Sequence, residues 1–281
     1  MRVLVMLDGT HADADHPHIR VDDLGLMRGD GVFETVLVVD GQPRELGPHL
    51  DRLARSAAML NLPAPDLAAW ERVSQAVIDR WTGSGEFALK LVYTRGPEFG
   101  DGSPTAFALG MTIGPKTFTH REGGVAALTL DRGFDPSIVE RAPWLLLGAK
   151  TLSYALNMAA LRYAEAHGAD EAIFIASDGS VLEGPTASIV LVEGDTMRTT
   201  PPTIGILPGT TQAALFRAAE RSGWTTRTEP IHRDELKGAE GLFLVSSVRK
   251  VTRVHTLDGV ELPDSVKLHT ELSALYESEY P

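Results

Sequence analysis

The sequence predicts an α+β protein with two domains. Four apolar or β-branched runs separated by turn residues lie before residue 115, and helix-period runs lie between them. Strands and helices again alternate after residue 123. Between the two halves runs the polar stretch GPKTFTHREGG, with three glycines and one proline, which is typical of a linker. We therefore expect an N-terminal domain at 1–115, a linker at 116–123 and a C-terminal domain at 124–281.

The first half contains predicted strands and two predicted helices. In the first helix the apolar residues recur at i, i+3, i+4, i+7 and i+10, and Pro48 can occupy its first turn. The predicted strands lie at 2–7, 33–39, 88–94 and 106–113, and the helices at 48–60 and 66–81.

The second half adds further elements in the same way. Asp178-Gly179 between two apolar runs is a two-residue hairpin signal, and glycines at 168 and 223 follow two of the predicted helices. The predicted strands include 125–130 and 241–246, and the helices lie at 154–167, 212–222 and 267–276.

Composition excludes several classes of protein. The 281 residues carry 26 Lys and Arg against 38 Asp and Glu, a net charge of −12, which disfavours binding to nucleic acid or to an anionic membrane surface. There is no cysteine, so disulfides, thiolate metal sites and cysteine nucleophiles are excluded. No apolar run approaches the roughly 20 residues that span a bilayer. We expect a soluble, cytoplasmic protein, and we interpret the His- and Asp-rich segment 11–18 as a solvated loop, not as a metal site.

One segment has the features of a phosphate-binding site. In GILPGTTQAALFRAAERSG, glycines and Pro208 form a turn, and Thr210 and Thr211 begin a helix. Unpaired backbone N–H groups and two hydroxyls meet where the helix dipole is positive, which favours an anion. The alternative is that a threonine simply caps the helix.

Two charged residues stand in apolar surroundings. Lys150 follows WLLLGA, and an amine desolvated there would have a lowered pKa suited to Schiff-base chemistry, although it could instead reach solvent from an apolar surface. Glu183 lies in SVLEGPTASIVLV, where an unpaired carboxylate is costly and a protonated heterocyclic nitrogen would serve as a partner. Otherwise Glu183 faces outward on an edge strand.

These features occur in a known order. Lys150 in GAKTLSY, Glu183-Gly184 before a strand and the L-P-G-T-T turn before a helix resemble the fold-type IV enzymes that use pyridoxal 5′-phosphate, the class IV aminotransferase family. This family includes branched-chain and D-amino-acid aminotransferases and 4-amino-4-deoxychorismate lyase. The resemblance covers nearly the whole chain, because the following strings also occur in the order of the family: RGDGVFET at 28–35, HLDRLARSA at 49–57, LKLVYTRG at 89–96 and FLVSS at 243–247.

The resemblance implies a fold and a set of roles. It implies a smaller N-terminal α/β domain, a larger C-terminal domain, the cofactor in the cleft between them, and a homodimer. Lys150 would carry the internal aldimine and act as general base, and Glu183 would pair with the pyridine nitrogen. Leu207 would pack against the cofactor ring. The phosphate would be bound by Arg52, Thr210, Thr211 and Ser247. Without the family, Arg52 reads as a solvated charge on the polar side of its helix, and Ser247 as a turn residue.

The resemblance also suggests a reaction. LKLVYTRG is most similar to the K-x-x-x-[ST]-R-G segment of the lyase, which releases pyruvate from 4-amino-4-deoxychorismate to form 4-aminobenzoate for folate. The candidate binders of a substrate carboxylate are then Arg28, Lys90 and Arg95. Several relatives have a second arginine where this chain has Gly100, so other groups must replace it. The alternatives are an aminotransferase acting on D-amino acids, branched-chain amino acids or other amines, and a cofactor-binding protein without catalysis.

Overall fold

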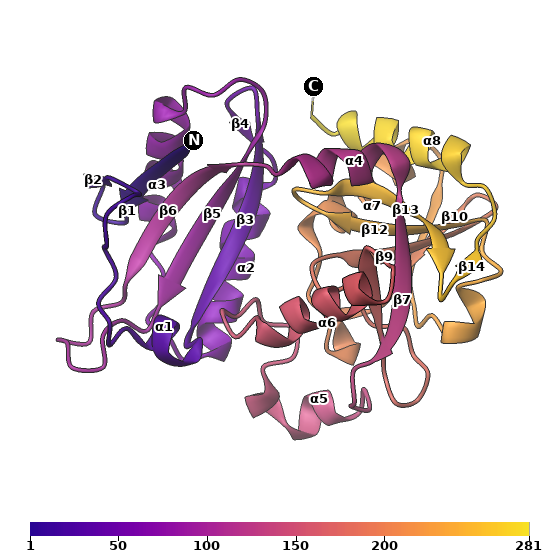
Figure 1. Cartoon of the computed structure of the whole chain (residues 1–281), viewed down its shortest axis with the longest axis horizontal. Helices are drawn as coiled ribbons and strands as arrows, with labels where there is room; N and C mark the ends of the chain where they lie inside the picture. Colours follow the sequence, from indigo (N-terminus) through magenta and orange to yellow (C-terminus); the bar gives the residue numbers. More distant parts are fainter. Residues whose placement is uncertain (281) are drawn as a thin grey trace. The chain divides into compact units, whose positions relative to one another are not determined.

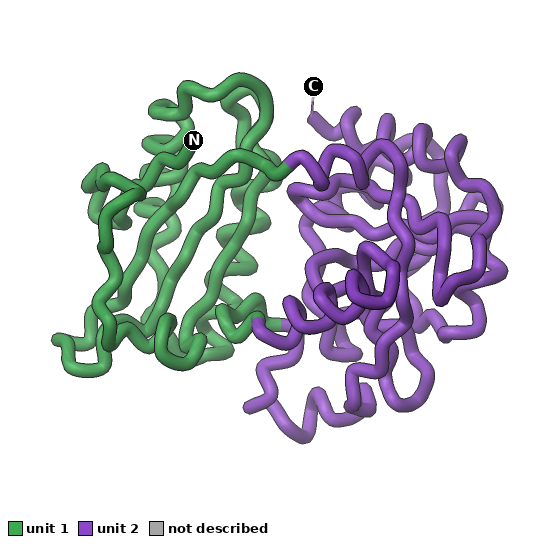
Figure 2. The backbone as a smooth tube through the Cα atoms, viewed as in Figure 1, with its two compact units in different colours: residues 1–114, 149–154 green, residues 115–148, 155–281 purple. Residues whose placement is uncertain are grey.

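The computed structural model describes residues 1–280, and the chain divides into two compact units (Figures 1 and 2). Unit 1 comprises residues 1–114 and 149–154, and unit 2 comprises residues 115–148 and 155–281. The expected α+β architecture is confirmed, since each unit combines helices with its own sheet. No helix of residues 1–280 combines the length and the apolar character needed to cross a bilayer.

Unit 1 is built on a six-stranded antiparallel sheet with the order β2-β1-β6-β5-β3-β4. Its central strands are long and almost entirely buried, as expected from their runs of Val, Leu and Phe. The strands are β1 Arg2–Met6, β2 His11–Ala12, β3 Gly31–Val39, β4 Gln42–Pro43, β5 Phe87–Thr94 and β6 Ala106–Thr112. The helices are α1 Leu24–Arg28, α2 Leu46–Met59 and α3 Leu67–Arg80.

Helices α2 and α3 pack on this sheet, α2 on β3 and α3 on β1 and β6, and they contact each other. Asp66 caps α3 by accepting a hydrogen bond from the Ala69 N–H. The free edge of β3 at its beginning is taken by residues 149–154, because the Leu152 N–H donates to the Gly31 carbonyl at 2.8 Å. The segment that contains Lys150 is therefore paired with β3 of unit 1 through an isolated bridge between Val32 and Thr151.

Unit 2 contains a mixed eight-stranded sheet with the order β11-β10-β9-β12-β13-β7-β8, and β14 pairs with β13. The strands are β7 Val125–Asp131, β8 Glu171–Ile175, β9 Ser188–Glu193, β10 Thr196–Thr199, β11 Thr225–Thr228, β12 Gly241–Ser246, β13 Lys250–Leu257 and β14 Val260–Glu261. The α-helices are α4 Pro115–Gly123, α5 Ile138–Arg141, α6 Ala155–Ala166, α7 Thr210–Arg221 and α8 Val266–Glu277. Three short 3-10 helices lie at Pro143–Leu145, Pro202–Ile204 and Arg233–Glu235.

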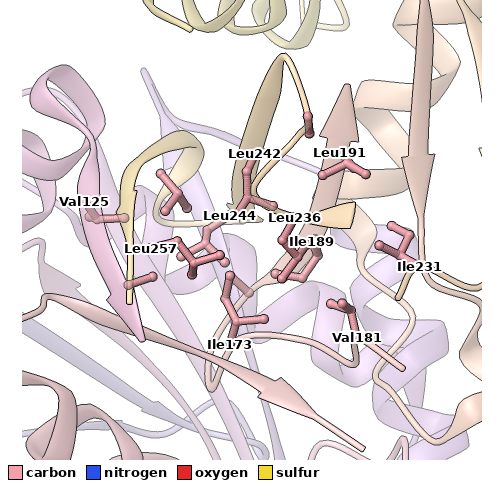
Figure 3. Close-up of a cluster of buried hydrophobic side chains, with 14 of the residues drawn as sticks. Val125, Ile173, Val181, Ile189, Leu191, Ile231, Leu236, Leu242, Leu244 and Leu257 are labelled. Carbon is pink, nitrogen blue, oxygen red and sulfur yellow. The ribbon is translucent and has the colours of Figure 1, made fainter. Parts of the chain in front are cut away.

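The core of unit 2 lies on both faces of this sheet. One face carries a cluster of aliphatic side chains from β7, β8, β9, β12 and β13, among them Leu191 and Leu244 (Figure 3). The other face packs against α7 and α8 through Phe243, Leu215 and Tyr276. Helix α7 is thus packed against the sheet along its apolar side, and this packing holds its N-terminus in place.

Two local expectations differ from the structure. The predicted linker at 116–123 is helical and forms most of α4, which belongs to unit 2. The turn at Asp178-Gly179 exists, but it joins only a short pairing of Ile175 with Val181, and β9 pairs with β10 and β12 instead. Glycines and a proline at the ends of a polar segment mark helix boundaries as readily as they mark a linker.

Replacing a side chain at the centre of the cluster in Figure 3 tests this description of the core. Leu244→Ala removes a side chain that is 0% exposed and should lower the free energy of unfolding by about 2–5 kcal/mol. The matched control is Leu145→Ala, whose side chain is 45% exposed and whose loss should cost less than about 1 kcal/mol. Urea unfolding measures both values, and equal costs would contradict the assignment of Leu244 to the core.

Candidate functional site

The backbone of Lys150 is fixed by two elements of unit 1. The Phe33 N–H donates to the Lys150 carbonyl at 3.1 Å, and the Lys150 N–H donates to Ser56 Oγ at 3.1 Å. The first contact comes from β3 and the second from α2. The position of the lysine therefore depends on how that strand and that helix pack together.

The amine of Lys150 lies over aromatic rings. Its Nζ is 4.7 Å from the centroid of the Phe33 ring and 5.9 Å from that of Tyr154. The two rings meet edge to face, with centroids 5.2 Å apart. A ring face attracts a cation, so this pair defines where the amine lies.

Lys90 on β5 places a second amine against the same ring. Its Nζ is 4.8 Å from the centroid of Phe33, and burial lowers the pKa of Lys90. Within residues 1–280, Lys90 has no ion pair and no hydrogen bond from its side chain. A half-buried cation without a carboxylate partner is costly, which indicates a site for an anionic group.

A buried ionic network joins β3 to α2. Glu34 is fully buried and accepts from Arg52 Nε at 2.7 Å and from Arg52 Nη2 at 2.7 Å. His49 Nδ1 lies 2.6 Å from Glu34 Oε2, the oxygen that also accepts from Arg52 Nη2. Burial acts to raise the pKa of Glu34, but the charge and hydrogen bonds of Arg52 and His49 outweigh it and lower the pKa to about 2.

The interpretation of Arg52 without the family, as a solvated helix charge, is wrong, and Glu34 and His49 were not predicted from the sequence. Arg52 does not lie on a solvated side of its helix, because it is 5% exposed. The signal was present: on α2 the polar residues His49, Arg52 and Ser56 recur at helical spacing beside Leu50 and Leu53. This row of buried polar residues is missed if every polar position of an amphipathic helix is assumed to face solvent.

In unit 2, three predicted residues gather at the start of α7. Thr210 and Thr211 are its first two residues, both are buried, and Thr211 Oγ1 lies 3.3 Å from Ser247 Oγ. A Cβ atom at Gly209 would overlap the Ser188 hydroxyl, so the approach to the helix requires glycine. Hydroxyls and the first N–H groups of a helix are a donor set suited to a phosphate.

Glu183 is close to Leu207, as expected for two residues of one site. The Leu207 N–H donates to Glu183 Oε2 at 3.1 Å. A neighbouring cation was missed: burial lowers the pKa of Arg132, and the negative charge of Glu183 partly offsets this. The carboxylate thus accepts one backbone hydrogen bond and lies within the electrostatic range of one arginine.

The remaining predicted residues lie elsewhere in unit 1. Arg95 forms a bidentate pair with Asp30, at 2.8 and 3.0 Å, and donates to the carbonyls of Leu60 and Asn61. Arg28 ends α1, is exposed, and has Glu98 Oε1 at 3.4 Å. These contacts do not bring either arginine to Lys150, and their assignment to the substrate stays a prediction.

Comparisons with known proteins cover nearly the whole chain. A family model described as amino-transferase class IV matches residues 31–257. A bifunctional aminodeoxychorismate lyase / D-amino acid transaminase of Mycobacterium tuberculosis is 43% identical over 270 residues, which cover 93% of each chain.

Two solved structures are similar over nearly their full length. The PLP-bound form of a hypothetical aminotransferase from Mycobacterium tuberculosis superposes with a TM-score of 0.94 at 41% identity, covering 98% of both chains. The fold IV-transaminase CpuTA1 from Curtobacterium pusillum gives a TM-score of 0.93 at 42% identity, covering 99% of this chain and 98% of the other.

Glu34→Gln tests the buried network through its pH dependence. At pH 7 the variant should be less stable by about 3 kcal/mol, because Arg52 stays charged in a buried place without its carboxylate. The folded pKa of Glu34, about 2, lies below the ordinary value of 4.5. Its contribution is therefore complete above pH 4.5 and is lost as the pH falls toward 2.

Urea unfolding at several pH values should show wild type and Glu34→Gln converging below pH 4.5. The exposed Glu71→Gln on α3 is the control and should match wild type at every pH. A constant difference between wild type and Glu34→Gln down to pH 2 would mean that Glu34 is not held ionised by the network.

Proposed function

The chain belongs to the class IV aminotransferase family, and we propose that it is a 4-amino-4-deoxychorismate lyase, which releases pyruvate to form 4-aminobenzoate for folate synthesis. The observation that carries this proposal is the pair of amines, from Lys150 and Lys90, over the ring of Phe33. One amine serves the reacting carbon and the other a carboxylate of the substrate.

The cofactor is pyridoxal 5′-phosphate, as in the family, and when bound it stabilises negative charge that develops on the substrate carbon bearing the amine. The residues of the chain fit this group. Thr210, Thr211 and Ser247 offer hydroxyls and helix N–H groups for its phosphate. Arg52, whose charge is balanced by Glu34, would add guanidinium N–H donors for the phosphate.

Glu183 and Leu207 would serve the ring of the cofactor. The carboxylate of Glu183, which accepts a hydrogen bond from the Leu207 N–H, would hold a proton on the ring nitrogen. Leu207 would pack against the ring.

Lys150 would hold the cofactor covalently through Nζ until the substrate arrives. Its released amine then removes the proton from the substrate carbon that bears the amino group. The bond from the neighbouring carbon to the enolpyruvyl oxygen breaks, the departing group takes up a proton as pyruvate, and the six-membered ring becomes aromatic. Lys90 would bind a carboxylate of this substrate and hold it beside Phe33.

The second candidate is a transaminase acting on D-amino acids. The relative from Mycobacterium tuberculosis carries both activities in its name. The two reactions share the step in which a lysine removes a proton from the carbon bearing the amine, and they differ in where the next proton goes. Lys150 could serve in either reaction, because transamination requires it to deliver the proton again and elimination does not.

Product analysis distinguishes the two candidates. We expect purified protein supplied with 4-amino-4-deoxychorismate to produce 4-aminobenzoate and pyruvate in equal amounts, detected by absorbance and by a coupled dehydrogenase. Lys150→Ala should reduce the rate by at least about 10³-fold, because it removes the general base. The parallel reaction contains D-alanine and 2-oxoglutarate. Rapid oxo-acid formation there, without aromatic product from the first substrate, would assign the transaminase instead.

Lys90→Met tests the carboxylate site. It keeps the apolar stem over Phe33 but removes the charge, so KM for 4-amino-4-deoxychorismate should rise about 10- to 100-fold with little change in kcat. The control Lys267→Met lies exposed on α8 and should leave both constants unchanged. An unchanged KM in Lys90→Met would remove Lys90 from the substrate site.

A further inference from the structure

The turn that carries Ser247 is held by several contacts in unit 2. Residues 247–249 connect β12 to β13, whose last pair is Ser246 with Lys250 (Figure 1). Ser247 Oγ lies 3.3 Å from Thr211 Oγ1, at the start of α7. A hydroxyl on a turn can bind a phosphate well only if the turn is held in one conformation.

Arg121 of α4 binds this turn directly. Its Nε donates to the Val248 carbonyl at 3.0 Å, and its Nη2 donates to the same oxygen. Two charged N–H groups on one carbonyl form a strong contact. The guanidinium also lies over the ring of Phe118, 5.0 Å from its centroid, which restricts the arginine itself.

The residue after Val248 is anchored separately. Arg249 Nη1 lies 2.5 Å from Glu171 Oε1, and this carboxylate is 2% exposed. Thr252 Oγ1 donates to the Arg249 carbonyl at 3.2 Å. These contacts hold the far end of the turn, and Arg121 holds the carbonyl of Val248, the residue that follows Ser247.

We propose that Arg121 is a positioning residue for the cofactor phosphate: by holding the Val248 carbonyl, it keeps the Ser247 hydroxyl directed to the start of α7. The inference rests on the proposed role of Ser247. Arg121 acts through the turn and needs no contact with the cofactor. A side chain of α4, expected from the sequence to be linker, would thereby set cofactor affinity.

The test compares two ligands that differ only in the phosphate. Apoprotein of the full chain is titrated with pyridoxal 5′-phosphate and with pyridoxal, and the dissociation constants are measured by fluorescence. Arg121→Ala should weaken binding of the phosphorylated ligand about tenfold and leave pyridoxal binding unchanged. Arg121→Lys, which keeps the charge but not the two-fold contact, should fall between wild type and Arg121→Ala.

A double-mutant cycle shows whether Arg121 acts through Ser247. Ser247→Ala should by itself weaken binding of the phosphorylated ligand, and adding Arg121→Ala should then cause little further loss. The control Lys116→Ala, an exposed cation on the same helix, should behave as wild type.

The outcomes separate the two ideas. If Ser247→Ala leaves the affinity for pyridoxal 5′-phosphate unchanged, the assigned phosphate role of Ser247 fails. If Ser247→Ala weakens it but Arg121→Ala and Arg121→Lys do not, the positioning role fails and the proposed function stands. Equal loss for both ligands in Arg121→Ala and Arg121→Lys would also overturn the positioning role, because Arg121 would then only support the fold.

Discussion

The buried carboxylate of Glu34 is the constraint on which the candidate site of unit 1 depends. Its ion pair with Arg52 ties β3 to α2, and Lys150 is hydrogen-bonded to the same strand and the same helix, through Phe33 and Ser56. A charge removed from water is costly unless it is paired in good geometry. The network therefore permits only one packing of helix on strand, and that packing fixes the lysine.

The network also changes how the charge of the site is counted. Because Glu34 stays ionised beside Arg52, the pair contributes little net positive charge. The positive charge beside Phe33 in unit 1 then comes from the two lysines over this ring, and the low polarity of the ring strengthens their field. In a chain with a net charge of −12, two such amines are a strongly local feature.

Much of the fold could be predicted from the sequence, since long apolar strands and amphipathic helices have clear periods. The start of α7 was also recognisable, because Gly209 and the two threonines combine a turn with a helix start. The contacts between distant side chains were not recognisable from the sequence. No pattern along the chain says that Glu34 reaches His49 and Arg52, fifteen and eighteen residues away, or that Arg121 reaches Val248, because such contacts depend on tertiary packing.

The bridging segment at 149–154 determines when unit 1 can be completed. The chain leaves unit 1 after residue 114 and returns to it only for these six residues. During synthesis, the edge of β3 near Gly31 and Phe33 must stay uncovered while residues 115–148 emerge from the ribosome. An open strand edge invites pairing with other chains. Until residues 149–154 emerge, the nascent protein therefore exposes the backbone groups at the edge of β3 that the segment containing Lys150 will later bind.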